Sequence, residues 1–224
     1  IFISCAYAKQ NVKIIGSDPG VTAAYNGGTH MPFEDLGIMR GMPGVTVIEP
    51  TDVVMIRDLL PKIAAHNGVV YTRLVRKSCE SIYEDGSTFE IGKANTVRDG
   101  KDVTVIAMGY CVGQALIAAK ELAAEGIDVR VLDMFTLKPL DKGAILKAAK
   151  ETGTIVTAEN HYVNNGLGSS VAEVLCENCP TPLVRLGSQD QFGEVGSRDF
   201  LADKFGMNAK AIAAACRKAV AAKK

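Results

Sequence analysis

Short β-rich runs alternate with helical patterns along almost the whole of this 224-residue chain. Seven runs rich in β-branched and apolar residues predict strands, at 12–17, 45–49, 69–74, 103–108, 129–135, 154–159 and 183–186. Helical spacing or capping residues predict helices between and after them, at 32–40, 52–66, 112–123, 141–152, 166–179 and from 208 onward. Alternation of this kind favours βαβ units with right-handed crossovers and mostly parallel sheets that are covered on both faces.

Residues 77–101 interrupt this alternation. They are rich in Ser, Glu, Asp, Gly and Lys and show little periodicity, which is typical of a connecting segment. At most one short strand is expected within it. Because a block of alternating strands and helices lies on each side, the expected fold class is α/β, with two three-layer αβα domains.

Charged side chains balance, since Lys and Arg number 25 and Asp and Glu also number 25. No basic stripe or polybasic tail is present, so nucleic acid and anionic membranes are not expected as partners. No apolar run approaches the roughly 20 residues of a membrane span, and no signal-peptide pattern occurs. The chain begins at Ile1 rather than Met, in what reads as the middle of an element. We therefore expect further sequence to precede it.

Six cysteines lie mostly within apolar patterns, at positions 5, 79, 111, 176, 179 and 216. This usage predicts reduced thiols and a cytoplasmic location. Cys176 and Cys179 have Cys-x-x-Cys spacing, but a zinc site needs a second pair or histidines nearby in the sequence. A redox pair would open a helix, whereas this pair ends one. Both are expected to be structural, and no metal site is expected in this chain.

The loop at residues 26–30, Asn-Gly-Gly-Thr-His, is the strongest candidate for chemistry. It lies between an apolar run that predicts a buried strand and a predicted helix. The glycine pair lets backbone approach a ligand closely. Thr29 and His30 then place a hydroxyl and a titratable imidazole near the carboxyl end of the strand, where ligands bind in open α/β sheets.

A second glycine-rich segment, Gly-Leu-Gly at 166–168, follows His161 and opens a predicted helix. Two interpretations are open. A helix amino end can cradle an anion, but the interpretation we favour is a tight strand-to-helix turn. His66 is predicted to end a helix and carries no functional assignment.

Several segments in this order resemble one family. They are Val-Lys-Ile-Ile-Gly-Ser at 12–17, Gly-Gly-Thr-His at 27–30, Glu-Asp-Leu at 34–36 with Met39-Arg40, Pro-Gly-Val-Thr-Val-Ile-Glu-Pro at 43–50, Asp-Met-Phe-Thr-Leu-Lys-Pro-Leu-Asp at 133–141, Gly-Leu-Gly at 166–168 and Asp-Gln-Phe-Gly-Glu at 190–194. Over this length they are highly specific to the thiamine-dependent transketolase group. The chain resembles the carboxyl-terminal part of a transketolase of the split, two-subunit bacterial kind.

The resemblance implies a layout. Residues 1–80 would form the later part of the pyrimidine-binding domain, 81–92 a linker and 93–224 the carboxyl-terminal domain. Thiamine diphosphate and Mg²⁺ would be bound mainly by residues outside this chain, in an amino-terminal subunit or domain, and the glutamate that activates the cofactor would lie upstream of Ile1. No cofactor-binding residue is therefore expected here. The implied partners are that amino-terminal subunit and a second copy, in a homodimer formed through both domains, so the chain alone is expected to be inactive.

The resemblance also implies roles for individual residues. The assembled enzyme would transfer a two-carbon ketol unit between sugar phosphates. His30 matches a catalytic and substrate-binding histidine that contacts sugar hydroxyls, with a loop histidine bonded to backbone as the alternative. Arg76 falls where the family binds the substrate phosphate, and its guanidinium presents the parallel donors that suit a phosphate. Arg73 is close in sequence, so a shift of register would give the phosphate-binding role to Arg73 instead of Arg76.

Two expected substrate-binding positions depart from the family pattern. Asn26 stands where transketolases usually carry an aspartate that helps select hydroxyl configuration. Asp18 stands where many members carry a phosphate-binding histidine, and a carboxylate there would repel phosphate. A changed ketol substrate, or a diverged loop, would account for both.

Two rival interpretations remain open at this stage. The beta chain of a 2-oxo acid dehydrogenase decarboxylating component shares both domain folds, although the loop at 26–30 and the segment at 190–194 fit transketolase better. A non-catalytic assembly or regulatory chain would tolerate the altered Asp18 and Asn26.

Overall fold

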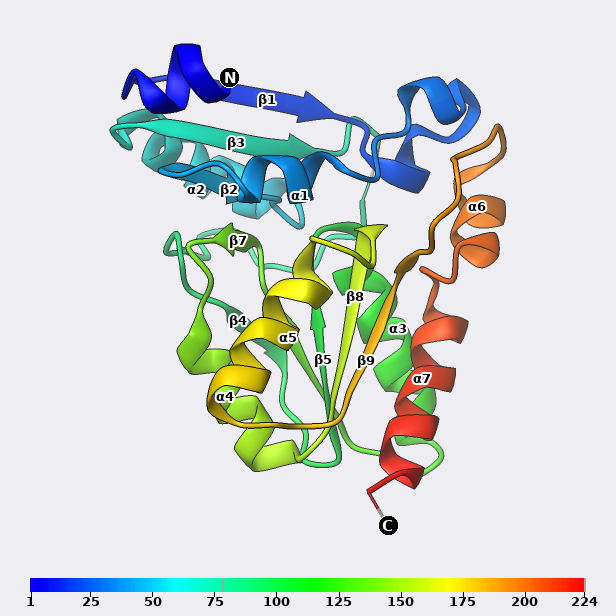
Figure 1. Ribbon diagram of the computed structural model, residues 1–224. Coiled ribbons are helices and arrows are strands. Elements are labelled where there is room, and N and C mark those ends of the chain that lie inside the picture. The colour runs from blue at the N-terminus through cyan, green and yellow to red at the C-terminus, as the bar shows by residue number, and fades with distance from the viewer. Residues whose placement is uncertain (78, 224) are drawn as a thin grey trace.

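The computed structural model describes residues 1–77 and 79–223 and shows two stacked units, each built on a mostly parallel sheet (Figure 1). The first sheet has the strand order β1-β3-β2-β7. Its strands are β1 (Lys13–Ser17), β2 (Val45–Ile48), β3 (Val69–Leu74) and β7 (Thr136–Lys138). Strands β1, β2 and β3 are parallel, and β7 runs antiparallel to β2.

Alternate residues of β3 face opposite layers. Val70 belongs to a cluster with Leu59 of α2 (Val53–Ala65), whereas Tyr71 packs in a cluster with Leu36 of α1 (Asp35–Arg40). Helices α1 and α2 therefore cover the two faces of the first sheet, as the period of two along a strand requires. Asp52 caps α2, because its carboxylate accepts a hydrogen bond from the backbone N–H of Met55 at 2.9 Å.

The second sheet has the order β4-β6-β5-β8-β9. Its strands are β4 (Asn95–Arg98), β5 (Val103–Ala107), β6 (Val129–Asp133), β8 (Ile155–Tyr162) and β9 (Leu183–Ser188). Only β4 pairs antiparallel among these described strands. The helices around it are α3 (Tyr110–Ala123), α4 (Lys142–Thr152), α5 (Leu167–Asn178) and α7 (Ala209–Ala221).

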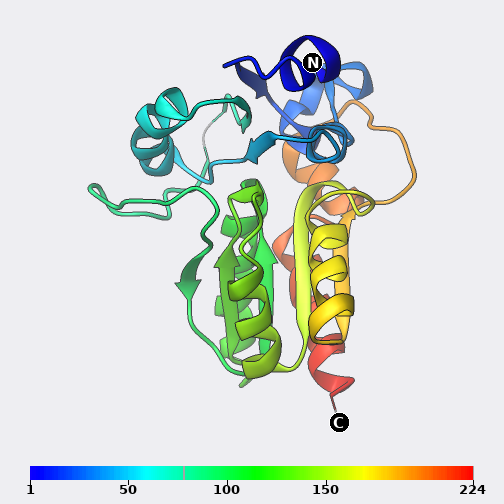
Figure 2. The same cartoon turned by 60° about the vertical axis from the view of Figure 1, so that its left-hand side comes forward.

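This sheet is also covered on both faces (Figure 2). Val105 of β5 shares a buried cluster with residues of α3 and α7, whereas its neighbour Ile106 shares another with residues of α4 and α5. The second cluster continues into the first sheet and includes Val47 and Tyr71. The predicted α/β class with three-layer, mostly parallel architecture is confirmed.

Several elements were not predicted. These are a π-helical turn at Phe2–Tyr7, the short 3-10 segments η2 (Gly20–Asn26) and η3 (Gly28–His30), strand β7 and helix α6 (Arg198–Lys204). The predicted strand 129–135 was wrong at its end. It leaves the second sheet after Asp133, and the chain then pairs with the edge of β2. A strand of the second block thus extends the first sheet, and the boundaries 1–80, 81–92 and 93–224 stay a prediction.

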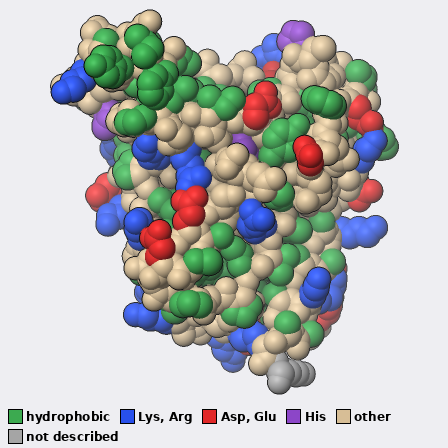
Figure 3. Space-filling model, in the orientation of Figure 1, with side chains coloured by type: hydrophobic (Ala, Val, Ile, Leu, Met, Phe, Trp, Pro, Cys, Tyr) green, Lys and Arg blue, Asp and Glu red, His purple; other side chains and the backbone are tan. Residues whose placement is uncertain are grey.

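The prediction that the first strand is buried was also wrong. Within the described residues β1 is an edge strand, and Ile15 is 57% exposed. Apolar side chains gather over the nearby amino-terminal turn at the upper left of Figure 3, where Phe2, Ile3 and Tyr7 are exposed. None of the described helices is both long enough and apolar enough to cross a membrane.

Candidate functional site

The loops that follow β1 and β3 emerge together, because the last residues of these parallel strands, Ser17 and Leu74, are paired. They bring Asp18 and Arg76 into contact. Nε of Arg76 lies 2.7 Å from Oδ2 of Asp18, and the backbone N–H of Arg76 donates to Oδ1 of Asp18 at 2.9 Å. The Asp18 side chain is 6% exposed and that of Arg76 is 64% exposed. The pair thus offers an arginine to solvent while its carboxylate partner is buried.

Arg73 has a different environment and is 1% exposed. Its guanidinium lies 3.0 Å from Oδ2 of Asp35 and 3.1 Å from Oε2 of Glu49, and it donates to the backbone carbonyls of Pro32 and Asn160. Burial alone would lower the pKa of Arg73, but the charges of Asp35 and Glu49 outweigh it and raise the pKa. Arg73 is therefore a structural cation, and the arginine at this edge that can reach a ligand is Arg76.

The loop at 26–30 is held against the second unit. Gly27 has a φ of +75°, and Gly28 lies against the carbonyl of Gly193 with no room for a Cβ atom. His30 is exposed, and its Nδ1 shares a hydrogen bond of 2.8 Å with Oγ1 of Thr29. This contact orients the imidazole and leaves Nε2 for another partner.

His30 lines a cavity of about 620 Å³ together with residues of both units. Tyr162 and Phe192 form part of its wall, and Phe192 is 94% exposed. Asn26 is exposed but is not among the residues that line this cavity. Of the predicted site residues, the described part of the chain brings Asp18 to Arg76, whereas no hydrogen bond or ion pair there links these two to Asn26 or His30.

Asn160, at the end of β8, holds the loop that leads to these residues. Its Oδ1 accepts from the backbone N–H of Val21 at 2.8 Å, and its Nδ2 donates to the carbonyl of Pro19 at 2.9 Å. Gly20 lies between them, with a φ of +48° and no room for a Cβ beside Oδ1 of Asn160. One buried amide of the second unit thus fixes the start of η2 in the first.

Replacing Asn160 with alanine is expected to lower the free energy of unfolding by about 1–3 kcal/mol, since a buried N–H and a buried C=O lose their partner. Urea unfolding measures this loss, and hydrogen exchange should speed up at 19–26. Asn178→Ala is the matched control, because Nδ2 of Asn178 donates to Val174 at 2.8 Å within one exposed helix end. Equal losses in both variants would contradict the role of Asn160.

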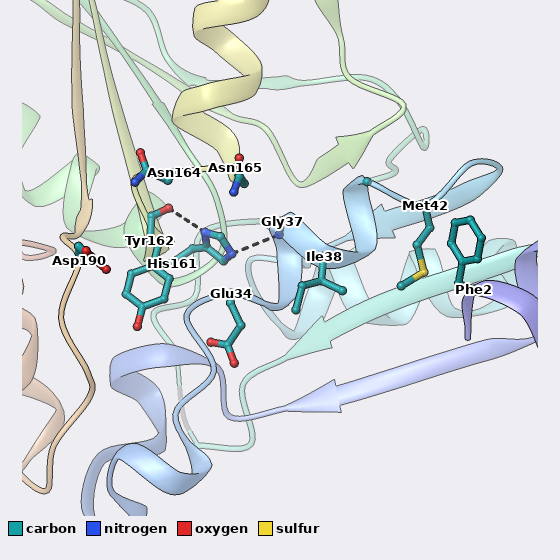
Figure 4. A pocket seen from close by; sticks show the side chains of 11 residues that line it. Phe2, Glu34, Gly37, Ile38, Met42, His161, Tyr162, Asn164, Asn165 and Asp190 are labelled. Atoms are coloured by element: carbon teal, nitrogen blue, oxygen red, sulfur yellow. Dashed lines mark hydrogen bonds between the residues drawn. The ribbon is translucent and has the colours of Figure 1, made fainter.

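A second cavity, of about 540 Å³, lies between α1 and the turn that follows β8 (Figure 4). His161 points from the end of β8 toward α1. Its Nε2 accepts a hydrogen bond from the backbone N–H of Gly37 at 3.2 Å, while its Nδ1 donates to the carbonyl of Tyr162 at 2.7 Å. Burial lowers the pKa of His161 to about 4, with help from the charge of Arg73. This histidine is neutral at physiological pH and joins the two units.

The amino end of α5 is filled by a side chain of the protein itself. The carboxylate of Glu159 accepts from the backbone N–H of Leu167 at 2.6 Å and of Gly168 at 2.8 Å. Gly166 has no room for a Cβ because Glu159 lies against it. The interpretation as a tight turn is confirmed, and an external anion at this helix end is excluded by the carboxylate. Burial raises the pKa of Glu159 to about 7, although both N–H groups oppose the shift.

The described residues do not supply a cofactor site by themselves. Among residues 1–77 and 79–223, no group of three or more His, Cys, Asp or Glu is arranged to hold a metal ion. The six cysteines are free, with Cys176 exposed and Cys179 partly buried at the end of α5. The described residues therefore offer no acidic or His/Cys cluster of the size that would hold Mg²⁺.

Family models match both units. The model of the transketolase pyrimidine-binding domain matches residues 1–80, and that of the transketolase carboxyl-terminal domain matches residues 92–212. The chain belongs to the transketolase family. Its matches to transketolase subunits favour transketolase over the 2-oxo acid dehydrogenase rival.

Individual transketolase relatives cover almost all of the chain. It is 52% identical over 212 residues to the 6-deoxy-6-sulfo-D-fructose transketolase subunit SqwH of a Clostridium species, a match to 95% of this chain and 66% of that protein. It is 41% identical over 190 residues to an apulose-4-phosphate transketolase subunit of Phocaeicola vulgatus, covering 84% of this chain and 61% of that one. The chain thus spans slightly less than two thirds of the length of these curated relatives.

A solved structure described as a split gene transketolase, inactive beta4 tetramer, superimposes with a TM-score of 0.93 at 42% identity. The match covers 100% of this chain and 72% of that one.

Four buried polar residues of this transketolase chain were not assigned a role from the sequence. They lie in the second half of an apolar strand or directly after it, and they are Glu49, Asp133, Glu159 and Asn160. Asp133 accepts from Thr51 at 2.6 Å and from Tyr83 at 2.8 Å, and burial raises its pKa to about 7. A polar residue near the end of a predicted apolar strand was the signal available for finding them.

Proposed function

We propose that this chain is the carboxyl-terminal part of a thiamine diphosphate-dependent transketolase, which transfers a two-carbon ketol unit between anionic sugars. The observation that carries the proposal is the exposed loop at 26–30, which lies against the second unit and contributes His30 to a cavity lined by both units. The names of the two curated relatives support this reaction class, since one is named for a sulfo-sugar and the other for a sugar phosphate.

Each proposed site residue has a chemical role. His30 contacts sugar hydroxyls and can hold or move a proton at Nε2, because Nδ1 is engaged by Thr29. Asn26 supplies an amide donor and acceptor to the donor sugar in place of a charged carboxylate. Arg76 binds the distal anionic group of the substrate through its guanidinium.

The remainder of the site is proposed to lie outside this chain. Thiamine diphosphate with Mg²⁺ supplies the electron sink for cleaving the bond next to the ketone. An amino-terminal subunit or domain would hold both, and a homodimer through the two domains described here would complete the enzyme. We infer that the chain is inactive alone, and six free cysteines support a cytoplasmic location.

The test is ketol transfer by the chain assembled with its amino-terminal partner, thiamine diphosphate and Mg²⁺. Transfer from a ketose to an aldose is expected, and His30→Gln should lower kcat/KM about 10–100-fold through loss of an oriented hydrogen bond and proton carrier. His66→Gln is the matched control, since Nε2 of His66 lies 3.3 Å from Thr46 away from the loop. Absence of transfer by the complete assembly, with release of carbon dioxide from 2-oxo acids instead, would refute the proposal.

A further inference from the structure

The contact between Asp18 and Arg76 has a consequence for the substrate. Asp18 has a φ of 57°, in the left-handed region that Asp, Asn and His adopt more readily than other side chains. In this position its Oδ1 accepts a hydrogen bond from the backbone N–H of Arg76, and its Oδ2 pairs with Nε of the same arginine. Asp18 therefore fixes both the loop after β3 and the direction of the guanidinium.

The pair also changes the local charge. The unit positive charge of Arg76 is offset at 2.7 Å by the unit negative charge of Asp18. Because the arginine side chain is 64% exposed, it still has surface for hydrogen bonds to a ligand. The Coulomb attraction between Arg76 and each negative charge of a ligand is nevertheless weaker than it would be for an unpaired arginine.

We propose that Asp18 is a positioning residue that makes the Arg76 subsite favour a sugar whose distal group is a monoanion, such as a sulfonate, over a phosphate dianion. A phosphate monoester carries about −1.5 to −2 charges at pH 7, whereas a sulfonate carries one. Both groups present tetrahedral oxygens that accept from a guanidinium, so hydrogen bonding does not separate them. The second charge of the phosphate separates them, since the carboxylate of Asp18 repels it while Arg76 already carries the opposing charge. This inference rests on the proposed transketolase function.

The experiment compares three probes on the complete assembly, fructose 6-phosphate, 6-deoxy-6-sulfofructose and fructose. Asp18→Asn keeps an acceptor and tolerates the left-handed backbone but removes the charge. It should raise the ratio of kcat/KM for the phosphate over that for the sulfonate about three- to tenfold. Arg76→Met should lower kcat/KM for both anionic probes by a larger factor than kcat/KM for fructose. Because each ratio is taken on one preparation, a lower yield of folded variant cancels.

Asp85→Asn is the matched control, since Asp85 pairs with Arg57 at 3.3 Å on the surface. The side chain of Arg57 is 69% exposed and that of Asp85 is 87% exposed. In Asp85→Asn the ratio of kcat/KM for the phosphate over that for the sulfonate should equal the ratio in the unmodified enzyme. An unchanged ratio in Asp18→Asn, in an assembly that transfers ketol units, would overturn the inference and leave the proposed function standing. No transfer from any probe by the unmodified assembly would instead refute the proposed function and the inference with it.

Discussion

Replacing Arg73 with leucine is expected to lower the free energy of unfolding by about 3–5 kcal/mol, because two carboxylates would lose their buried counter-charge. Glu49 is 1% exposed, and the Asp35 side chain is 15% exposed. The backbone carbonyls of Pro32 and Asn160 would also lose a donor. Urea unfolding of the chain at pH 8 measures the loss. Arg57→Leu is the control, since this exposed ion pair should contribute about 1 kcal/mol or less.

The loss in Arg73→Leu should depend on pH. Burial raises the pKa of Glu49 and the charge of Arg73 opposes that shift, so removing Arg73 raises the pKa further. An acid whose folded pKa exceeds its unfolded value stabilises the fold below the unfolded pKa, and this stability is lost as pH rises through the folded pKa. Relative to the unmodified chain, Arg73→Leu should therefore lose less free energy of unfolding at pH 5 than at pH 8. An equal loss at both values would show that packing, rather than uncompensated charge, explains the result.

The fold was largely predictable because its main signals are local. Apolar runs bounded by glycine, proline or capping residues placed the strands and most helices. Asp52 and Asn208 cap helices that begin where the sequence pattern predicted. Strand β7 was not predictable in this way. Thr136–Lys138 reads as a continuation of β6, and its separate pairing depends on the edge of β2, about 90 residues away in sequence.

The candidate site was predictable in its residues but not in its contacts. The sequence left Arg73 and Arg76 as alternatives, and burial decides between them, since one is enclosed by Asp35 and Glu49 and the other lies beyond the end of β3. A free carboxylate at position 18 was expected to repel phosphate. In the structure this carboxylate is instead bound to Arg76 from a loop 58 residues away. Pairing of this kind is set by strand order, which no local pattern contains.

Replacing Glu159 with alanine is expected to lower the free energy of unfolding by about 3 kcal/mol, since two backbone N–H groups at the buried start of α5 would lose their acceptor. Glu159→Gln keeps a carbonyl oxygen for one of them and should cost less. Exposed Glu177 lies on the same helix, and Glu177→Gln is the control that should change stability by about 0.5 kcal/mol or less. Thermal or urea unfolding distinguishes the three variants.

The same glutamate should give the protein a measurable dependence of stability on pH. The folded pKa of Glu159 is about 7, above the unfolded value near 4.3, so the folded state holds this proton longer. The stabilisation that protonation of Glu159 gives the folded state is complete below about pH 4.3 and is lost as pH rises through 7.

Two other buried groups also make stability depend on pH. Asp133, whose pKa is raised to about 7, lowers stability as pH rises, as Glu159 does. His161, whose pKa is lowered to about 4, instead raises stability as pH rises from 4 to 6.5. Both remain in Glu159→Gln, and because Nδ1 of His161 lies 3.8 Å from Oε2 of Glu159, the difference from the unmodified chain reports Glu159 together with its effect on His161. That difference should narrow from pH 5 to pH 8, and a constant difference would place the Glu159 proton outside the folding equilibrium.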